Sequence, residues 1–381
     1  MISESSLKTK IAAIHASVYR GVFVVTGGGS GLLSALLSVP GASRTVLDAE
    51  VPYSPNALRS FLGRLPEHCC AEQTARQMAV VAWQRALRFS DELDFSTLFG
   101  FSLTATLATD RPHRGEHRAF AAFHTARQTR AYSLVLQKGL LTREEEEARV
   151  TGWALSVLAE CLQLEAPEIA SLHHAEVSED WCQLELGKRP YIAVPLRGEP
   201  TAWKGIFPGS FAPFHSGHAK MQQIASEILG GEVALERAVR NADKPPLDYV
   251  EIQQRLHQIE TAPFFTGSTL LLSALPFFQM KAEAFPGTTF VVGTDTLERI
   301  ADVRFHNGNR VAMLRSHEQL AALGCCFLVF GRLSPEGTFV SLEDLDLPPV
   351  LKSLCTGVPE SAFRMDISST ELRQKEEHQA G

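Results

Sequence analysis

The feature that most constrains this fold is a turn rich in glycine, proline and histidine at residues 209–218. An apolar run at residues 203–208 precedes it and is short enough for one buried strand, and residues 219–229 follow with apolar side chains at a helical period. His215 and His218 therefore lie on one face, where a strand passes into a helix. The backbone N–H groups and the positive end of the helix dipole point at the same spot. The segment thus predicts a strand–turn–helix unit whose turn suits a polyphosphate.

A second phosphate-binding pattern lies near the C-terminus, at residues 367–373. Ser368 and Glu371 have the spacing of a capping box, which by itself predicts only the start of a helix. Arg373 falls in the first turn of that helix, where a guanidinium can bind a phosphate through two parallel hydrogen bonds. In a chain that also carries the histidine turn, this pattern favours a second binding element for the same polyphosphate.

Two further apolar runs indicate buried parallel strands that end in polar residues. Residues 289–292 run into Gly293 and Asp295, and residues 325–331 run into Arg332. Ligands of open parallel sheets bind outside the carboxyl ends of the strands, so Gly293 and Asp295 are candidates for lining a nucleotide site. For Arg332 two interpretations stay open, a ligand-binding residue and a salt-bridged structural residue.

The turn and the C-terminal pattern resemble the nucleotidyltransferases with the H-x-G-H signature, and among them the nicotinate/nicotinamide mononucleotide adenylyltransferases. The chain has Gly-Ser-Phe-x-Pro-x-His-x-Gly-His at residues 209–218 and Ile-Ser-Ser-Thr-x-x-Arg at residues 367–373, but Ala212 stands where that family often has Asp. The resemblance implies a doubly wound, Rossmann-like parallel sheet. The catalytic residues that it implies are His215, His218 and Arg373, and the nucleotide-binding residues are Gly209, Ser210, Phe211, Gly293, Asp295, Ser369 and Thr370.

The resemblance also implies a reaction. AMP would pass from ATP, bound with Mg²⁺, to nicotinamide or nicotinate mononucleotide, with release of pyrophosphate, in NAD biosynthesis or salvage. Within the same superfamily, a pantetheine-phosphate adenylyltransferase and a cytidylyltransferase stay open as alternatives. An alternative of another class is a non-catalytic nucleotide sensor or scaffold, which the departure at Ala212 suggests.

The N-terminal half carries another glycine turn, residues 26–31, between a predicted strand and a predicted helix. Over about residues 5–163 it is similar to the CinA C-terminal family, the nicotinamide-mononucleotide amidohydrolases. Position by position, that family's serine nucleophile falls at Gly27 and its activating lysine at Leu58. Glycine has no nucleophile and leucine cannot activate one, so we expect the α/β fold to be kept and the hydrolysis to be lost. Such a domain could bind a pyridine nucleotide, dimerise, or support its neighbour.

Length and composition set the remaining expectations. A chain of 381 residues should form two α/β domains, at residues 1–165 and 201–381, with a linker region at residues 166–200. The formal charge of −7 argues against a nucleic-acid or anionic-membrane partner. Seven cysteines without C-x-x-C spacing predict reduced thiols and no protein-bound metal. Because no apolar segment has the length of a signal or a membrane span, we expect a cytoplasmic protein, and homo-oligomerisation stays open.

Overall fold

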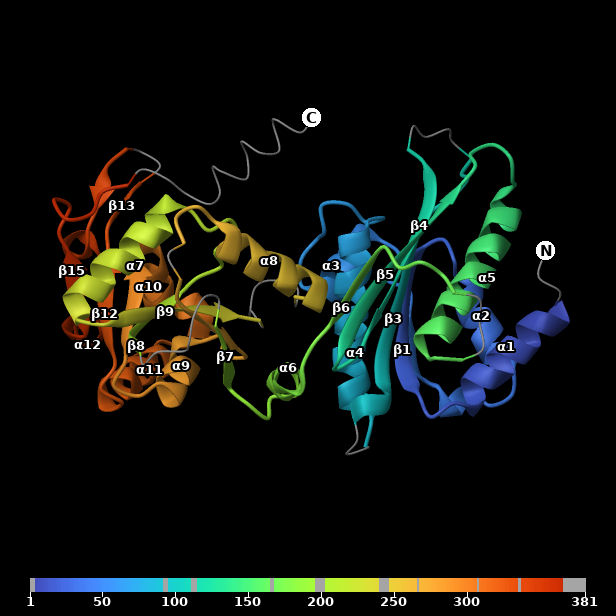
Figure 1. Cartoon of the computed structure of the whole chain (residues 1–381), viewed down its shortest axis with the longest axis horizontal. Helices are drawn as coiled ribbons and strands as arrows, with labels where there is room; N and C mark the ends of the chain where they lie inside the picture. Colours follow the sequence, from blue (N-terminus) through green and yellow to red (C-terminus); the bar gives the residue numbers. More distant parts are fainter. Residues whose placement is uncertain are drawn as a thin grey trace. The chain divides into compact units, whose positions relative to one another are not determined.

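The computed structural model of the chain contains two compact units (Figure 1). Unit 1 consists of Met1–Leu186 together with Asn241–Gln253, and unit 2 consists of Gly187–Arg240 together with Gln254–Gly381. The short segment 241–253 thus belongs with unit 1, although it follows part of unit 2 in the sequence. The residues that the structure describes are 4–91, 95–110, 115–164, 168–195, 203–239, 247–265, 267–306, 308–334 and 337–365.

Unit 1 is built on a six-stranded mixed sheet. Its strands are β1 (Arg20–Gly27), β2 (Val46–Glu50), β3 (Leu98–Thr106), β4 (His117–His124), β5 (Gln128–Leu136) and β6 (His173–Glu176). Its helices are α1 (Glu4–Ala16), α2 (Gly31–Ser38), η1 (Ala42–Arg44), α3 (Pro55–Leu62), α4 (Glu72–Phe89), η2 (Phe95–Thr97), α5 (Arg143–Cys161) and α6 (Glu179–Glu185). The strand order is β2-β1-β3-β4-β5-β6, with β1 parallel to β2 and β3 and the remaining pairs antiparallel.

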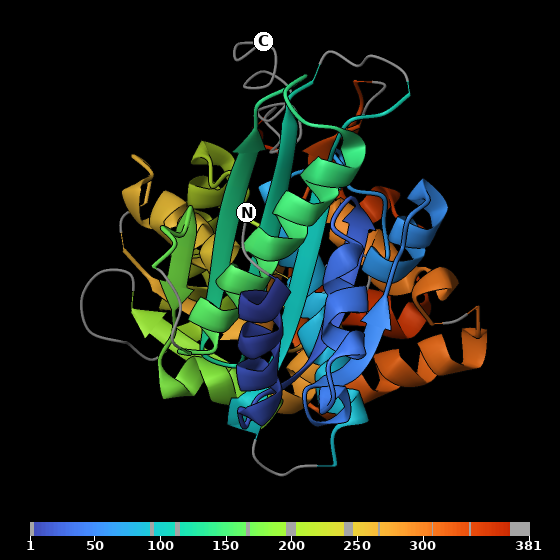
Figure 2. The ribbon, with the colours of Figure 1, turned by 90° about the vertical axis from the view of Figure 1, so that its right-hand side faces the viewer.

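Both faces of this sheet are covered. Phe23 and Val25 of β1 pack in a core with α1, α2 and α5, the face that Figure 2 looks onto. Val22 and Val24 pack in a second core with α3 and α4. A strand that is buried on both faces has no need of polar alternation, which explains the continuous apolar run that predicted β1.

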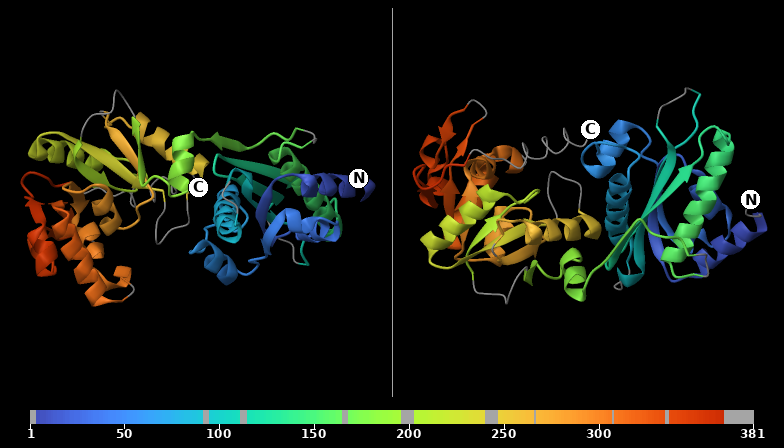
Figure 3. Two further views of the ribbon diagram at one scale, coloured as in Figure 1. Left: turned by 90° about the horizontal axis from the view of Figure 1, so that it is seen from below. Right: turned by 45° about the horizontal axis from the view of Figure 1, so that its top comes forward.

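Unit 2 is built on a seven-stranded sheet. Its strands are β7 (Tyr191–Pro195), β8 (Trp203–Pro208), β9 (Glu232–Ala238), β10 (Thr269–Ser273), β11 (Thr289–Gly293), β12 (Cys326–Phe330) and β15 (Cys355–Val358), and a separate hairpin comprises β13 (Arg332–Leu333) and β14 (Phe339–Val340). The helices of this part of the chain are α7 (Ser216–Leu229), α8 (Tyr249–Thr261), α9 (Phe278–Ala284), α10 (Thr294–Ala301), η3 (Val303–His306), α11 (Arg310–Ala322), η4 (Leu342–Asp344) and α12 (Pro349–Ser353). The division between the units crosses α8. In Figure 3, left, α7 lies on the opposite side of the sheet from α9 and α11.

The order of the strands confirms the predicted doubly wound sheet. It is β15-β12-β11-β8-β9-β10-β7, with β7 antiparallel to β10 and the other pairs parallel. From β8 the chain builds the sheet outward through β9 and β10, and then returns to the other side of β8 with β11, β12 and β15. The direction of winding therefore reverses between β8 and β11, and in open parallel sheets this switch point is where ligands bind.

The elements nearest the switch point agree with the sequence-based expectations. The predicted strand 203–208 is β8, and the apolar run at residues 289–292 lies in β11. The helix expected at residues 219–229 begins earlier, at Ser216, with His215 in the N-cap position. The predicted linker region contains regular structure that its weak periodicity did not reveal: β6, α6 and β7.

Candidate active site

The candidate nucleotide-binding residues lie at the carboxyl ends of the two strands that flank the switch point. Gly209, Ser210 and Phe211 directly follow β8, whereas Gly293 ends β11 and Asp295 lies in the first turn of α10. Since β8 and β11 are parallel neighbours, both sets of residues stand at the same edge of the sheet. The structure therefore brings together two of the three sequence segments that were predicted to form the site. The third, with Ser369, Thr370 and Arg373, lies outside the described residues, so these assignments stay predictions.

The turn after β8 depends on one glycine and one strained residue. Phe211 has a φ of 44°, in the left-handed region that bulky side chains rarely adopt. Its ring folds back and is fully buried, in edge-to-face contact with Phe207. A Cβ atom on Gly209 would lie 2.6 Å from this ring, so only glycine fits there. The N–H group of Gly209 donates to the backbone oxygen of Glu236 at 2.9 Å, which ties the turn to β9.

His215 and His218 form a stacked pair at the start of α7. Their ring centroids are 3.7 Å apart, and the backbone N–H of His215 donates to Nδ1 of His218 at 3.3 Å. Because Nδ1 of His218 accepts this hydrogen bond, the neutral ring carries its proton on Nε2. His218 therefore presents an N–H donor on the side of the ring that faces away from the backbone of His215.

Both imidazoles are neutral at physiological pH. Burial lowers the pKa of His215 below its ordinary value. Burial, with a smaller contribution from His215, lowers the pKa of His218 to about 3. The pair can therefore offer N–H dipoles rather than positive charge, and such dipoles can stabilise negative charge on a phosphate without a proton transfer.

Asp295 is held by an ion pair with Arg332. Nη1 of Arg332 lies 3.0 Å from Oδ2 of Asp295, and both side chains are about half exposed. A Cβ atom on Gly293 would lie 2.8 Å from Oδ1 of Asp295, so glycine at this position leaves room for the carboxylate. Of the two interpretations of Arg332, the structure displays the salt-bridged one, and the pair remains accessible to a ligand from solvent.

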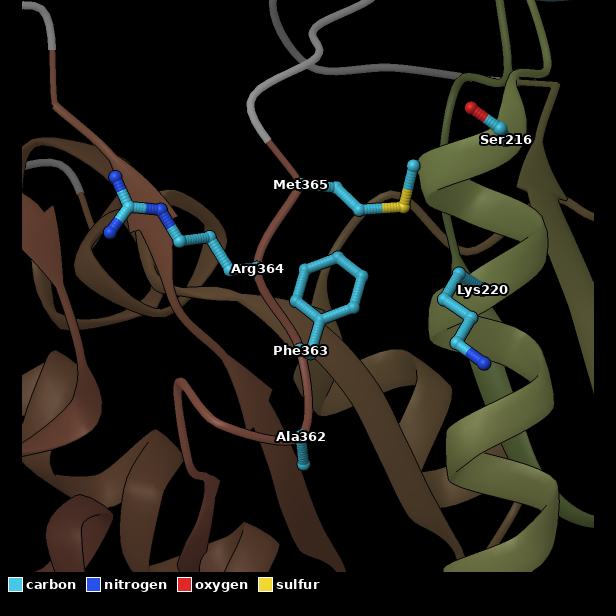
Figure 4. A pocket seen from close by; sticks show the side chains of 6 residues that line it. All are labelled: Ser216, Lys220, Ala362, Phe363, Arg364 and Met365. Atoms are coloured by element: carbon cyan, nitrogen blue, oxygen red, sulfur yellow. The ribbon is translucent and has the colours of Figure 1, made fainter.

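A cavity of about 310 Å³ opens beside α7. Figure 4 shows Phe363 and Met365 pointing toward the helix, whereas Arg364 points away from it. Ser216, in the first turn of α7, and Lys220, one turn later, line the cavity from the helix side. The full lining consists of Ser216, Lys220, Ala362, Phe363, Arg364 and Met365.

Sequence reasoning did not identify Lys220 as a candidate. The signal was present, because residues four apart share one face of a helix and Lys220 follows the first helical residue, Ser216, at that spacing. Its ammonium group donates to Oε1 of Gln223 at 3.2 Å and is exposed, and an exposed cation beside the cavity can contact the oxygens of a bound phosphate.

A buried charged cluster supports the turn from the sheet. Nζ of Lys281 lies 2.6 Å from Oε1 of Glu236, and the hydroxyl of Ser273 donates to the same oxygen. All three side chains are buried. The same Glu236 accepts the hydrogen bond from Gly209 through its backbone oxygen. The cluster thus fixes the strand on which the turn rests, and sequence reasoning missed it because its members come from β9, β10 and α9.

In unit 1, the two positions that the sequence comparison singled out are Gly27 and Leu58. Gly27 has a φ of 76°, and a Cβ atom there would lie 2.1 Å from the backbone oxygen of Ala105. A serine at this position would therefore require the backbone to move. Leu58 is 1% exposed and packs in the core with α4, so a lysine there would be buried. The loss of hydrolysis stays a prediction.

The glycine turn of unit 1 is occupied by a carboxylate of the chain itself. The N–H groups of Gly29 and Gly31 donate to the oxygens of Glu147 at 2.8 and 3.1 Å, and the hydroxyl of Ser30 donates at 3.0 Å. Burial acts to raise the pKa of Glu147, but these hydrogen bonds and Arg143 outweigh it, so the pKa lies below its ordinary value. The donors at the start of α2 are thus satisfied from within the fold.

This contact predicts an acid-sensitive contribution to stability. Glu147→Gln should lower the free energy of unfolding of unit 1 at pH 7 by about 1 kcal/mol, since hydrogen bonds to a partly exposed charge are partly screened by solvent. Because the folded-state pKa is lowered, the stabilisation is complete above the unfolded pKa of about 4.3 and is lost as the pH falls through the folded-state value. Urea unfolding at pH 7 and below pH 4 measures it.

The matched control is Glu144→Gln, an exposed glutamate in the first turn of the same helix, which should change stability little at either pH. A stability difference between wild type and Glu147→Gln that stays constant down to low pH would contradict the assignment, because it would then not depend on the carboxylate charge.

Comparison with known proteins separates the two halves of the chain. Residues 206–375 match the family described as cytidylyltransferase-like, which confirms the predicted resemblance of the C-terminal half to the nucleotidyltransferases. No curated protein matches the chain. In the described part of the chain, no helix is both long enough and apolar enough to cross a membrane, and no three or more His, Cys, Asp or Glu side chains gather there as a group that could hold a metal ion.

Several solved structures match the N-terminal part of the chain. One is the competence/damage inducible protein CihA from Agrobacterium tumefaciens, at 20% identity and a TM-score of 0.32, over 41% of this chain and 95% of that one. A second is the competence-damaged protein (CinA) superfamily protein ECK1530/EC0983 from Escherichia coli, at 16% identity and a TM-score of 0.33, over 42% and 94%. A third is the competence damage-inducible protein A from Klebsiella pneumoniae, at 19% identity and a TM-score of 0.33, over 41% and 95%. At this identity the likeness carries no activity over to this chain.

Proposed function

We propose that this chain, a nucleotidyltransferase in its residues 206–375, transfers AMP from ATP to nicotinamide or nicotinate mononucleotide and releases pyrophosphate. The observation that carries the proposal is the neutral histidine pair, which offers an N–H donor at the start of α7, next to the switch point of the sheet. The preference for a pyridine mononucleotide rests on the Ile-Ser-Ser-Thr-x-x-Arg pattern at residues 367–373 and on the resemblance of the N-terminal half to a family that acts on the same metabolite.

The proposed chemistry needs no covalent intermediate. A phosphate oxygen of the mononucleotide attacks the α-phosphorus of ATP, a new P–O bond forms, and the bond to the β-phosphate breaks with pyrophosphate as the leaving group. Catalysis then consists of positioning and of stabilising charge on the phosphoryl oxygens. Nε2–H of His218 donates to an oxygen of the reacting phosphate, and Arg373 binds the far end of the triphosphate. Mg²⁺ enters with ATP as part of the substrate and neutralises phosphate charge.

Because Lys220 lines the cavity beside α7, we place the ATP phosphates in this cavity, close to that lysine. We expect Lys220→Ala to raise the KM for ATP by about 3- to 10-fold, because one charge-assisted contact with a phosphate contributes about 1 kcal/mol at an exposed site. The KM for the mononucleotide should change little. Steady-state kinetics with each substrate varied in turn measures both values.

Lys204→Ala is the control for Lys220→Ala, because Lys204 is an exposed lysine near the start of β8 and so lies at the other end of that strand from the histidine turn. It should leave both KM values unchanged. If Lys220→Ala changes neither KM either, the triphosphate does not contact this end of the cavity.

The experiment that tests the proposed function is a pyrophosphate-release screen of the purified full-length protein. ATP and CTP are each paired with nicotinamide mononucleotide, nicotinate mononucleotide and 4′-phosphopantetheine. Release that requires ATP and a pyridine mononucleotide supports the proposal. Release with phosphopantetheine, or with CTP alone as donor, would assign the chain to one of the other H-x-G-H activities.

A second candidate function is nucleotide sensing without turnover. Ala212 favours it, since the acid that the adenylyltransferases often carry at this turn position is absent. Saturable binding of ATP by calorimetry, with no pyrophosphate released from any pair of substrates, would select the sensor over the enzyme.

A further inference from the structure

Aromatic rings pack around His218, which is partly buried. The Phe214 ring stacks on the imidazole, with centroids 5.6 Å apart and planes at 29°. Phe211 meets the same imidazole edge-to-face at 5.2 Å, and Phe207 does so at 6.0 Å. Phe214 is 6% exposed, and the ring of Phe265 packs against it at right angles, with centroids 5.8 Å apart. The histidine thus lies against apolar surface on several sides.

Of the two phenylalanines of this cluster that lie within the motif, Phe214 is the one that the motif does not specify. In the pattern Gly-Ser-Phe-x-Pro-x-His-x-Gly-His, position 211 is a fixed phenylalanine and position 214 is open. An open position can tune the site without disturbing the turn. In this chain it holds a large ring whose plane lies close to that of His218, and the ring therefore restricts how far the imidazole can rotate or be hydrated.

The charged groups around His218 are few. Among the described residues, the elements packed against it present the rings of Phe207 from β8 and of Phe211 and Phe214 from the turn, none of which titrates. Within the described residues, His215 at the N-cap of its helix is the one group whose charge would act on the ring, and a charge on His215 disfavours a second one. An aromatic face attracts a cation, but exclusion of water from the ring outweighs this attraction.

We propose that Phe214 is a positioning residue of the AMP-transfer site, which holds the His218 ring in place and keeps it in the neutral form that donates from Nε2. The inference rests on the proposed function for its effect on catalysis, but its effect on His218 exists without any substrate. It follows that the His218 donor persists on acidification well below neutral pH, because the ring does not gain the proton that a solvated histidine would take up near pH 6.5.

Two variants separate the two roles of the ring. Phe214→Leu keeps the site dry and removes the stacked ring, and Phe214→Gln also admits water. The first measurement is an NMR titration of the His218 Cε1–H resonance in the full-length protein without substrate, assigned with His218→Gln. In wild type and in Phe214→Leu, His218 should not titrate above about pH 5. In Phe214→Gln its midpoint should move toward 6.5. In both variants the resonance should shift, because the ring current of Phe214 is gone.

The second measurement is the dependence of kcat on pH. Phe214→Leu should lower kcat by about 10-fold at pH 7.5 with KM unchanged, since a displaced donor loses transition-state contact. Phe214→Gln should in addition acquire an acid limb with a midpoint near 6, which wild type lacks.

The outcomes distinguish this inference from the proposed function. A His218 midpoint in Phe214→Gln as low as in wild type would overturn the role in protonation, and wild-type kcat in Phe214→Leu would overturn the role in positioning. If Phe214→Gln does not fold, the kcat and the ring-current shift of Phe214→Leu decide the positioning role. If neither wild type nor any variant transfers AMP, the proposed function fails. The titration without substrate still decides whether Phe214 keeps the His218 ring neutral.

Discussion

Replacing His218 by alanine is expected to lower kcat for AMP transfer by about 10²–10³-fold, the usual loss on removal of one positioned donor from a charge-stabilising site. Its Nε2–H is oriented by the hydrogen bond that Nδ1 accepts from the His215 backbone. The imidazole also packs against three phenylalanine rings, so the alanine variant loses stability as well. Rates should therefore be normalised to the folded fraction, measured by circular dichroism at the assay temperature.

Two further variants separate the donor from the packing. His218→Phe keeps an aromatic ring in the cluster but offers no N–H, so we expect near wild-type stability and the full loss of kcat. His218→Gln offers an amide N–H from about the position of Nε2 and should recover part of the rate. The exposed His257→Ala on α8 controls for the loss of a histidine elsewhere. If His218→Phe were as active as wild type, the histidine would have a structural role and the site assignment would be wrong.

The strands and the turn that carry the site could be predicted from the sequence. The apolar runs of β8 and β11 are too short for anything but strands, and the glycine and histidine positions mark the strand-to-helix turn at residues 209–218. Periodicity and turn chemistry depend on neighbouring residues, so they can be recognised in a single sequence. The placement of Gly209 and Gly293 at one edge of the sheet followed from the rule that ligands bind at the carboxyl ends of parallel strands.

The contacts that hold the site together could not be predicted in this way, because they join residues that are distant in the chain. Lys281 reaches Glu236 from 45 residues away, and Glu147 reaches Gly29 from 118 residues away. The sequence around Glu236 and around Glu147 gives no indication of which residue each carboxylate contacts. The His218 surroundings are local, but they depend on the left-handed backbone of Phe211, a conformation that residue type alone argues against.

Replacing Lys281 by methionine is expected to destabilise unit 2 by about 3–5 kcal/mol, because it leaves the Glu236 carboxylate buried without its counter-charge. The two side chains are 5% and 1% exposed, and Nζ lies 2.6 Å from Oε1. Methionine retains much of the apolar stem of the lysine, so lost packing contributes little. The hydroxyl of Ser273 stays in contact with the carboxylate, but one neutral hydrogen bond cannot replace an ammonium group.

Hydrogen exchange followed by mass spectrometry measures this effect locally, in peptides from β8, β9 and β10, so that the unfolding of unit 1 does not enter the value. The matched control is Lys352→Met. Lys352 lies 3.8 Å from Glu343 in a solvent-exposed pair, and removal of one partner of such a pair typically costs less than about 1 kcal/mol. Equal losses of protection in the two variants would contradict the assignment of a buried ion pair.

The double variant Glu236→Gln with Lys281→Met isolates the charge. A neutral amide no longer needs the ammonium group and can still accept from Ser273, so we expect more than half of the lost stability to return. Because the backbone oxygen of Glu236, not its side chain, accepts the N–H of Gly209, the double variant should also restore the turn and with it AMP transfer. A double variant no more stable than Lys281→Met would show that packing of the lysine stem, rather than the pairing of charges, supports β9 beneath the histidine turn.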